Sequence, residues 1–308
     1  MQRLWVALIA LSACPGTPAT GRAEIPLAAP AATLPLAELS GLATVADGAG
    51  ATLLAVGDEA RTLLRLAWAD PLEPSRADRI ALPLPDSPGG SQLEAVAVDG
   101  AGLVYVLDEE RARVYVFAIT GERAELRHRY DLSFPAGRPL AGDWAKRPNK
   151  RGEGLVVLPS GHLLVAKQSH PMALIELGPA EDTPRGVAAD ATPARPPRPL
   201  GDVSELVPLA VWRPDDAASA VVGSLNELAR GPGGALYLVA SRPRATIARV
   251  KLPLSADGGA FAIDASWPIA TPGDGKAEGL TFGPGGRVAV GLDAKGDAPN
   301  LLLVAPLR

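Results

Sequence analysis

The chain has 308 residues, 47% of them hydrophobic, which is enough to bury a large core in one large β domain or two smaller ones. Its 30 basic and 34 acidic residues leave a formal charge of −4, without the excess of Lys and Arg that neutralises a nucleic-acid backbone. We therefore expect no nucleic-acid partner. No apolar run after the first dozen residues approaches the ~20 residues that span a bilayer, so we expect the mature chain to be soluble. We also expect a monomer.

The N-terminal segment predicts export. Residues 1–14 read MQRLWVALIALSAC, in which Arg3 supplies positive charge and residues 4–13 form an apolar stretch of signal-peptide length. The segment ends in Leu-Ser-Ala-Cys at 11–14, which resembles the lipobox of bacterial lipoproteins. That resemblance implies that Cys14 is lipidated and becomes the first residue of the mature protein.

Cys14 is the only Cys of the chain, so an intramolecular disulfide is impossible and a lone thiol would be a liability in an oxidising compartment unless it were capped. Lipidation explains this usage. The alternative is an ordinary secretory signal that is cleaved further on, for instance after Ala23. Both alternatives place the mature protein outside the cytoplasm, as a free periplasmic protein or as an outer-membrane-anchored lipoprotein that contacts the membrane only through its lipid. Residues 1–23 are therefore interpreted as signal and tether.

Five copies of one pattern follow, and they cover nearly all of residues 32–308. Each copy has a small or acidic residue, a Gly-Leu-like pair, a turn that ends in Gly, an alternating apolar strand, then polar residues and another apolar strand. The copies begin at Glu38, Gln92, Arg151, Ser224 and Lys276. Turns such as Asp-Gly and Gly-Pro-Gly-Gly between short strands rich in Val, Leu and Tyr are hairpin signals, so we expect almost no helix.

A fourth apolar stretch follows the third strand of four copies. These stretches are residues 80–84, 130–132, 209–212 and 267–270. Four strands in a period of about 50 residues are typical of a propeller blade, so the sequence predicts an all-β fold, a β-propeller with four-stranded blades. Five blades are counted, and six are possible if a degenerate copy lies in the long third interval.

The two ends of the chain are expected to close the ring. The last copy reaches residues 301–307 with no room for a fourth strand, whereas residues 32–36 form an extra strand ahead of the first copy. Pairing them would remove exposed sheet edges. Residues 179–200 are rich in Pro and Ala without strand periodicity, and are interpreted as a surface loop or disordered insertion within a single domain.

Alignment of the copies places five polar residues at one repeat position. They are Ser40, Glu94, Glu153, Asn226 and Glu278. The first strand of each propeller blade lines the central channel, so these residues are expected to converge there. Three ionised Glu side chains would repel one another unless their pKa values rise or a cation neutralises them. All-oxygen ligands favour Ca²⁺ ahead of Mg²⁺. The alternative is that these residues cap backbone amides or bind water between blades.

Basic residues near this position suggest an anionic ligand. Two residues earlier, on the same strand face, the copies have Glu38, Gln92, Arg151, Ser224 and Lys276. The polar loop 142–154 adds Lys146, Arg147, Asn149 and Lys150. We expect Arg151, Lys276, Asn149 and Glu38 to hold a phosphate or carboxylate beside the cation. Alternatively, the loop is solvated and its basic residues pair with the channel Glu residues.

A second equivalent set ends the next strand of each copy. It comprises Asp58-Glu59, Asp108-Glu109, Lys167-Gln168, Ser241-Arg242 and Asp293. These residues are interpreted as turn formers, because Asp and Ser side chains commonly accept hydrogen bonds from nearby backbone amides.

Several phrases resemble known families of exported proteins. NKRGEGLVVLPSGHLLVAKQSHP, ELSGLA, LLAVGDE and VLDEERARVYVF resemble the SdiA-regulated family, which implies a propeller-like fold and cation binding. The Asn-x-x-Gly-Glu-Gly-Leu phrase at 149–155 resembles the domain called esterase-like activity of phytase, which implies phosphoester or ester hydrolysis. That family has Lys-Glu where this chain has Lys167 and Gln168, which weakens the transfer of a carboxylate role to Gln168.

Two functions remain open at this stage. In one, a channel cation makes the ring rigid and the protein binds an anionic small molecule or an envelope partner without turnover. In the other, the protein is a metal-dependent hydrolase in which Glu153 and Glu278 hold the metal and the catalytic residues are unknown. No Gly-x-Ser-x-Gly elbow, His-Glu-x-x-His helix or P-loop occurs, and the three His residues occupy unlike repeat positions, which argues against a shared His site.

Overall fold

The structure is a computed structural model of the chain. It describes residues 24–29, 31–46, 50–58, 60–69, 71–85, 91–189, 204–296 and 298–307. The export signal, Cys14 and Ala23 lie outside the described residues, as do Glu59 and most of the Pro- and Ala-rich stretch. No helix within the described ranges has the length and apolar character that crossing a membrane requires.

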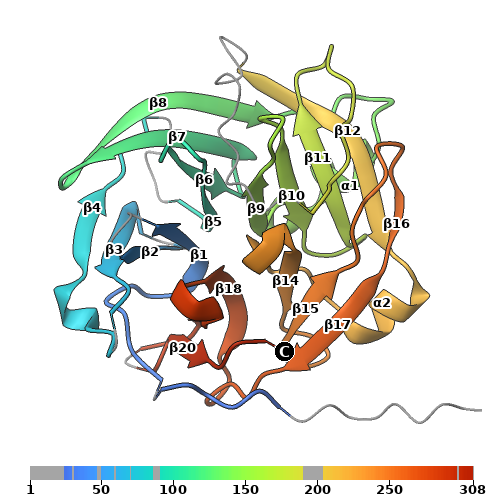
Figure 1. The fold of residues 1–308 in the computed structure, drawn as a ribbon. Coiled ribbons are helices and arrows are strands. Elements are labelled where there is room, and N and C mark those ends of the chain that lie inside the picture. The colour runs from blue at the N-terminus through green and yellow to red at the C-terminus, as the bar shows by residue number, and fades with distance from the viewer. Residues whose placement is uncertain are drawn as a thin grey trace, which may run out of the picture.

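The strands form antiparallel units arranged in a ring (Figure 1). Residues of the inner strands line a cavity, which we call the central channel. In chain order the first unit is β1 (Leu39–Ala46), β2 (Ala51–Gly57), β3 (Thr62–Ala67) and β4 (Asp78–Ala81), and the second is β5 (Leu93–Val98), β6 (Val104–Asp108), β7 (Arg113–Thr120) and β8 (Arg123–Leu132). The third is β9 (Gly154–Val157), β10 (Leu163–Lys167), β11 (Ala173–Gly178) and β12 (Glu205–Pro214). The fourth is β13 (Glu227–Arg230), β14 (Leu236–Ala240), β15 (Thr246–Val250) and β17 (Ile263–Pro268), and the last is β18 (Lys276–Phe282), β19 (Val288–Asp293) and β20 (Leu301–Val304).

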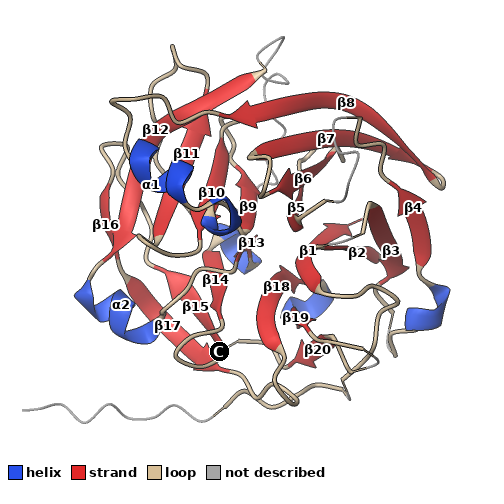
Figure 2. Ribbon diagram, turned by 180° about the vertical axis from the view of Figure 1, so that it is seen from behind, coloured by secondary structure: helices blue, strands red, loops and turns tan. Residues whose placement is uncertain are grey.

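This arrangement confirms the predicted β-propeller. The second and third units join into one nine-stranded sheet, because β12 pairs in parallel with β8 and also with the short β16 (Gly259–Phe261). Helix is limited, in the described residues, to α1 (Ala141–Lys146), α2 (Asp216–Val221) and four 3-10 turns. Figure 2 shows α1 and α2 beside the third and fourth units. The 3-10 turns are η1 (Pro74–Arg76), η2 (Pro148–Lys150), η3 (Pro232–Gly234) and η4 (Pro284–Gly286).

The two Gly-Pro-Gly-Gly segments form turns between strands, as the sequence predicts. In both Gly-Pro-Gly-Gly turns the last two glycines adopt positive φ, at +69° and +73° for Gly233 and Gly234, and +67° and +75° for Gly285 and Gly286. L-residues other than Gly rarely adopt this conformation, which explains the glycine pairs at both hairpins.

The hydrophobic core is divided among the junctions between neighbouring units. Five clusters of buried side chains occur, and each draws on two adjacent units. At the junction of the first and second units, for example, Leu54 and Val56 of β2 share a cluster with Val104 and Val106 of β6. Because every sheet packs on both faces, its central strands are apolar on both faces, as sheet-on-sheet packing requires.

The last unit is completed by the N-terminal segment. Leu27 pairs with Val304 and Ala32 with Leu301, in each case antiparallel. The Asn300 side chain strengthens this closure, since it accepts from Leu34 N at 2.7 Å and donates to Leu34 O at 3.1 Å. The predicted closure of the ring is confirmed, but the closing element is a set of isolated bridges and not the continuous strand expected at residues 32–36.

The polar loop differs from its predicted character. The polar loop at 142–154 contains η2 and most of α1, because Trp144 is buried and stacks on Phe134 with ring centroids 3.9 Å apart. Residues 179–189, the described start of the expected insertion, include Val187, which is buried and pairs with Leu254. In the long third interval the described residues form β12 and α2.

Candidate functional site at one end of the central channel

The five aligned polar residues lie at the start of the inner strands β1, β5, β9, β13 and β18. In three of these strands the pairing with the next strand skips the polar residue, so that Ser40, Glu94 and Glu278 occupy β-bulges. Glu153 and Asn226 come directly before their strands and are held by backbone hydrogen bonds. A bulge turns a side chain away from the regular alternation of the strand. This local feature places the polar residues in a buried position at the start of an otherwise apolar strand.

All five residues are buried, with exposed fractions of at most 9%. The three carboxyl groups among them lie close enough to influence one another. Burial raises the pKa of Glu94, and the Glu153 and Glu278 carboxylates raise it further. Burial also raises the pKa of Glu153, followed by the Glu109 and Glu278 carboxylates. The three Glu residues of the ring are therefore brought together across three units.

A second ring of residues lies beside the first. Strand register makes the following residues equivalent: Asp58, Glu109, Gln168, Ser241 and Asp293. The Ser40 hydroxyl donates to Asp58, and Asp58 shares a hydrogen bond with Glu94 of the next unit. In the fourth unit Asn226 Nδ2 donates to Ser241 Oγ at 3.3 Å. The sequence predicts turn formers at these positions, but three of the residues add carboxyl groups to the site.

We call the six carboxyl groups that meet here the carboxylate cluster. It consists of Glu94, Glu153 and Glu278 from the first ring and Asp58, Glu109 and Asp293 from the second. Burial, and then the neighbouring Asp293 carboxylate, raises the pKa of Glu278 to about 8. Burial likewise raises the pKa of Glu109 to about 7, against the opposing effect of the Arg151 amide.

Three other carboxyl groups of the cluster follow the same pattern. Burial is the largest cause of the raised pKa of Asp58, Glu94 and Glu153, and in all three cases further carboxylates add to it. The cluster therefore retains protons near neutral pH, because full ionisation would place several negative charges in a poorly solvated space. No group of three or more His, Cys, Asp or Glu side chains in the described residues is already arranged to hold a metal ion.

Asn226 offers a further oxygen. It is 2% exposed, and its Oδ1 atom has no hydrogen-bond partner among the described residues, although its Nδ2 atom donates to Ser241. Leaving a buried amide oxygen without a partner costs free energy, of the order of 1–3 kcal/mol. An amide oxygen, a hydroxyl and several carboxylates form the donor set that Ca²⁺ uses in proteins, so the residues present fit that ion in chemistry.

The four residues expected to bind an anion have different surroundings. Lys276 Nζ donates to Asp293 Oδ2 at 2.7 Å at the edge of the cluster, and this hydrogen bond raises the Lys276 pKa. Asn149 is exposed in η2. Glu38 has a positive φ of 50°, and its carbonyl oxygen accepts from the Ser40 hydroxyl at 3.0 Å.

Arg151 is hydrogen-bonded to neighbouring groups of the protein through its side chain and its backbone amide. Its Nε atom donates to the Trp144 carbonyl at 2.9 Å, its Nη1 atom donates to the Glu110 carbonyl at 3.0 Å, and its backbone amide donates to Glu109 Oε1 at 2.7 Å. These contacts tie α1 to the second unit. The positive charge that acts on the cluster comes also from Lys150, which opposes the rise in pKa of Glu109, Glu153 and Glu278.

Lys167 supports the loops next to the site. It is fully buried, and its Nζ atom donates to the carbonyl oxygens of Lys150 at 3.1 Å and Ser169 at 2.5 Å. These carbonyl oxygens satisfy the buried ammonium group. Lys167 therefore holds the backbone at Lys150 and Ser169 in place next to the site.

Sequence reasoning missed Glu227. This residue follows Asn226, at the repeat position where the other copies have Gly41, Ala95, Gly154 and Gly279. It is fully buried, and its Oε1 atom accepts from the amides of Leu228 at 2.8 Å and Leu155 at 3.2 Å. An ionisable side chain where every other copy has Gly or Ala was the signal that could have found it.

Comparison with known proteins supports the fold. Neither a scan of protein-family models nor a search of curated proteins gave a match. Among solved structures, a glutaminyl cyclase from Myxococcus xanthus has a TM-score of 0.50 at 14% identity, covering 89% of this chain and 93% of that chain. A PQQ-bound aldose sugar dehydrogenase from Streptomyces coelicolor has a TM-score of 0.48 at 14% identity, covering 91% and 97%.

A gluconolactonase from Xanthomonas campestris is also similar, with a TM-score of 0.41 at 15% identity over 88% of this chain and 76% of that chain. At 14% identity and a TM-score of 0.50, the similarity to the glutaminyl cyclase shows the fold alone. The resemblances to the SdiA-regulated family and to the phytase esterase-like domain stay predictions.

Proposed function

We propose that the carboxylate cluster binds a divalent cation, Ca²⁺ ahead of Mg²⁺, and that the loaded site holds an anionic small molecule. The observation that carries the proposal is the meeting of six carboxyl groups in a buried channel end, where burial and neighbouring carboxylates raise the pKa values of Asp58, Glu94, Glu109, Glu153 and Glu278. A cation removes this repulsion and allows the groups to ionise at neutral pH.

The first ring would provide most of the ligands. Glu94, Glu153 and Glu278 supply carboxylate oxygens from three units, and Asn226 supplies the amide oxygen that lacks a hydrogen bond. Ser40 would add a hydroxyl oxygen. Asp58 reaches the same space, since it shares hydrogen bonds with Ser40 and Glu94.

The anionic ligand would bind at the rim of the cluster. Lys276, whose side chain is 56% exposed beside Asp293, and the exposed Asn149 offer donors to a phosphate or carboxylate. Arg151 and Glu38 would define the wall of this rim through their contacts with α1 and β1. A protein of the cell envelope that presents an acidic group is the alternative partner.

Calcium titration tests the proposal. CaCl₂ should raise the melting temperature of the metal-free wild type, because an ion that binds only the folded state stabilises it by about 2.7 kcal/mol at a hundredfold excess over Kd. Glu153→Gln keeps the shape and removes one ligand charge, so its response should be much smaller. Glu122→Gln, in the exposed turn between β7 and β8, is the matched control and should respond as wild type does. Equal calcium responses in wild type and Glu153→Gln would refute the site.

Hydrolysis is a second candidate function, favoured by one observation. The pKa values of about 7 for Glu109 and about 8 for Glu278 lie near neutral pH, where a carboxyl group can exchange a proton during catalysis. A bound cation would polarise the oxygen of a phosphoester or ester. Release of p-nitrophenol from its phosphate or acetate ester, dependent on calcium and lost in Glu109→Gln, would favour this function. Calcium binding without turnover would support the binding function and exclude hydrolysis of these esters.

The proposal also includes export. A lipid on Cys14, or cleavage after Ala23, would place the propeller in the periplasm, free or anchored to the outer membrane. The resemblance to the SdiA-regulated family agrees with this location and with cation binding.

A further inference from the structure

The inner strands approach one another closely just beyond the first ring of polar residues. In four units the residue that follows the ring member is small, and these residues are Gly41, Ala95, Gly154 and Gly279. A Cβ atom on Gly154 would lie 2.5 Å from the Leu228 amide nitrogen, and one on Gly41 would lie 2.7 Å from Ala95 Cα. The backbones of neighbouring units therefore nearly touch at this level of the ring, which leaves no room for larger side chains between them.

Glu227 is the exception at this level. The fourth unit has a carboxylic side chain where the other four have Gly or Ala, and it is fully buried. Its Oε1 atom accepts from Leu228 N of β13 at 2.8 Å and from Leu155 N of β9 at 3.2 Å. The Leu42 amide of β1 also donates to this carboxyl group. One side chain thus joins the inner strands of the first, third and fourth units.

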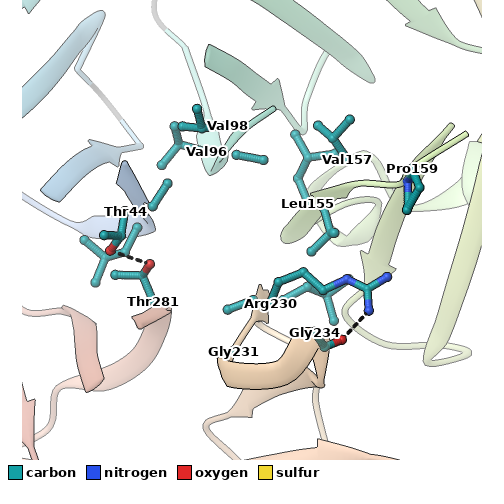
Figure 3. A pocket seen from close by; sticks show the side chains of 16 residues that line it. Thr44, Val96, Val98, Leu155, Val157, Pro159, Arg230, Gly231, Gly234 and Thr281 are labelled. Atoms are coloured by element: carbon teal, nitrogen blue, oxygen red, sulfur yellow. Dashed lines mark hydrogen bonds between the residues drawn. The ribbon is translucent and has the colours of Figure 1, made fainter. Parts of the chain in front are cut away.

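Strand pairing does not link these three inner strands. In the described sheets β1, β9 and β13 each pair with the strand that follows them in their own unit. Between the inner strands lies the central channel, a cavity of about 270 Å³ that Leu42, Leu155 and Leu228 help to line (Figure 3). The Glu227 carboxyl group is therefore a hydrogen-bonded link between the edges of three units, next to the carboxylate cluster.

The three amides that Glu227 binds are equivalent in the repeat. Each lies two residues after a member of the first ring, and those members are Ser40, Glu153 and Asn226. Two residues of a strand span ~6.6 Å and return to the same side of the backbone. An amide that is held at a fixed point therefore also fixes the ring member before it, and one carboxyl group sets the spacing of three ring members.

We propose that Glu227 is a positioning residue of the cation site. It holds equivalent amides of three units at one point and thereby keeps Ser40, Glu153 and Asn226 at the spacing that Ca²⁺ needs. The inference rests on the proposed function, because these three residues are ligands assigned there. Mg²⁺ takes oxygen ligands at about 2.0–2.1 Å and Ca²⁺ at about 2.3–2.6 Å, so a ring of fixed spacing discriminates between the two ions.

Amide hydrogen exchange, measured by NMR in EDTA, tests the link without any cation. Glu227→Ala should fold, because the second unit has Ala at the equivalent position. It should speed exchange of the Leu42 and Leu155 amides about tenfold or more, since both lose a buried acceptor. The Leu158 amide, which donates at 2.8 Å to a carbonyl oxygen of its own unit, is the matched control and should exchange as in wild type. Unchanged exchange at Leu42 and Leu155 would overturn the proposal.

Glu227→Gln is the conservative variant. The Oε2 atom of Glu227 has no hydrogen-bond partner among the described residues, so Gln keeps the acceptor oxygen and breaks no existing hydrogen bond. Exchange at Leu42 and Leu155 should therefore remain as in wild type. Fast exchange at both amides in Glu227→Gln would contradict a role that depends on the acceptor oxygen.

Melting temperatures in CaCl₂ and MgCl₂ test the consequence for the site. Glu227→Ala should bind Ca²⁺ about 10–100-fold more weakly, the usual effect of losing a residue that orients metal ligands, and should prefer it less over Mg²⁺. Glu227→Gln should keep the affinity and the preference of wild type. A general loss of stability would lower the melting temperature without changing this preference, so the readout separates positioning from a purely structural role.

Two results with cations are decisive. A preference for Ca²⁺ in Glu227→Ala equal to that of wild type would overturn the positioning role. A wild type without any calcium response would refute the proposed function, whereas the exchange rates at Leu42 and Leu155 would still decide whether Glu227 holds the inner strands together.

Discussion

Replacing Glu278 by Gln should flatten the pH dependence of stability in the cation-free protein. Burial and the Asp293 carboxylate raise the pKa of Glu278 from its ordinary 4.5 to about 8. Between these values the folded protein keeps a proton that the unfolded chain has lost, so stability falls as pH rises from 4.5 towards 8. At ~1.4 kcal/mol for each pKa unit, this carboxyl group alone lowers the free energy of unfolding by about 3 kcal/mol at pH 7. Gln has no proton to exchange and removes that loss.

The assay is urea unfolding between pH 5 and pH 7.5 in the presence of EDTA. Wild type should lose stability across this range, whereas Glu278→Gln should lose about 3 kcal/mol less by pH 7. At ~2–4 °C per kcal/mol for a domain of this size, the corresponding difference in melting temperature is about 10 °C. The Glu122→Gln control should follow wild type. Identical pH profiles for Glu278→Gln and wild type would refute the reasoning, because they would mean that Glu278 titrates alike in the folded and unfolded chains.

Three further perturbations test other parts of the molecule. Cys14→Ser should release the protein from the membrane fraction; a wild-type N-terminus that mass spectrometry finds unlipidated beyond residue 14 would contradict the anchor. Burial lowers the pKa of His162, but hydrogen bonds to Glu176 at 2.6 Å and Asp182 at 3.0 Å outweigh it and raise the pKa. The resulting stabilisation is complete below pH ~6.5 and is lost as pH rises through the folded pKa, so His162→Gln should cost about 1–3 kcal/mol at pH 6 and less at pH 9 by urea unfolding. Asn300→Ala should lower the free energy of unfolding by about 1–3 kcal/mol, because it removes the hydrogen bonds between Asn300 and Leu34. It should also speed hydrogen exchange at the Leu34 amide, and an unchanged exchange rate there would contradict the role of Asn300 in closing the ring.

The architecture was predictable because its signals are local. Hairpin turns and short alternating strands recur in every copy, and each can be recognised without knowledge of the others. The convergence of Glu94, Glu153 and Glu278 follows from that recurrence, since equivalent positions of a closed ring must face one another. The repeat thus predicted which residues meet, although it did not predict the bulges that direct Glu94 and Glu278.

The remaining features depend on contacts between units. Nothing near Asp58 or Glu109 distinguishes a turn former from a channel carboxylate, because the difference arises when the next unit supplies Glu94 or the Arg151 amide. Helix α1 forms in a polar segment because Trp144 stacks on Phe134, which follows β8. Tertiary contacts of this kind override local propensity.

The closure of the ring by Asn300 and the N-terminal segment imposes an order on folding. Leu34 and Asn300 are 266 residues apart, so the first-synthesised part of the propeller must wait for the last before its edge is covered. Bringing such distant segments together makes folding slow and leaves open strand edges in any partly synthesised chain. Until Asn300 has been made, the edge that the N-terminal segment covers in the finished ring therefore stays open, and the last strands to be synthesised decide when this edge is protected from aggregation.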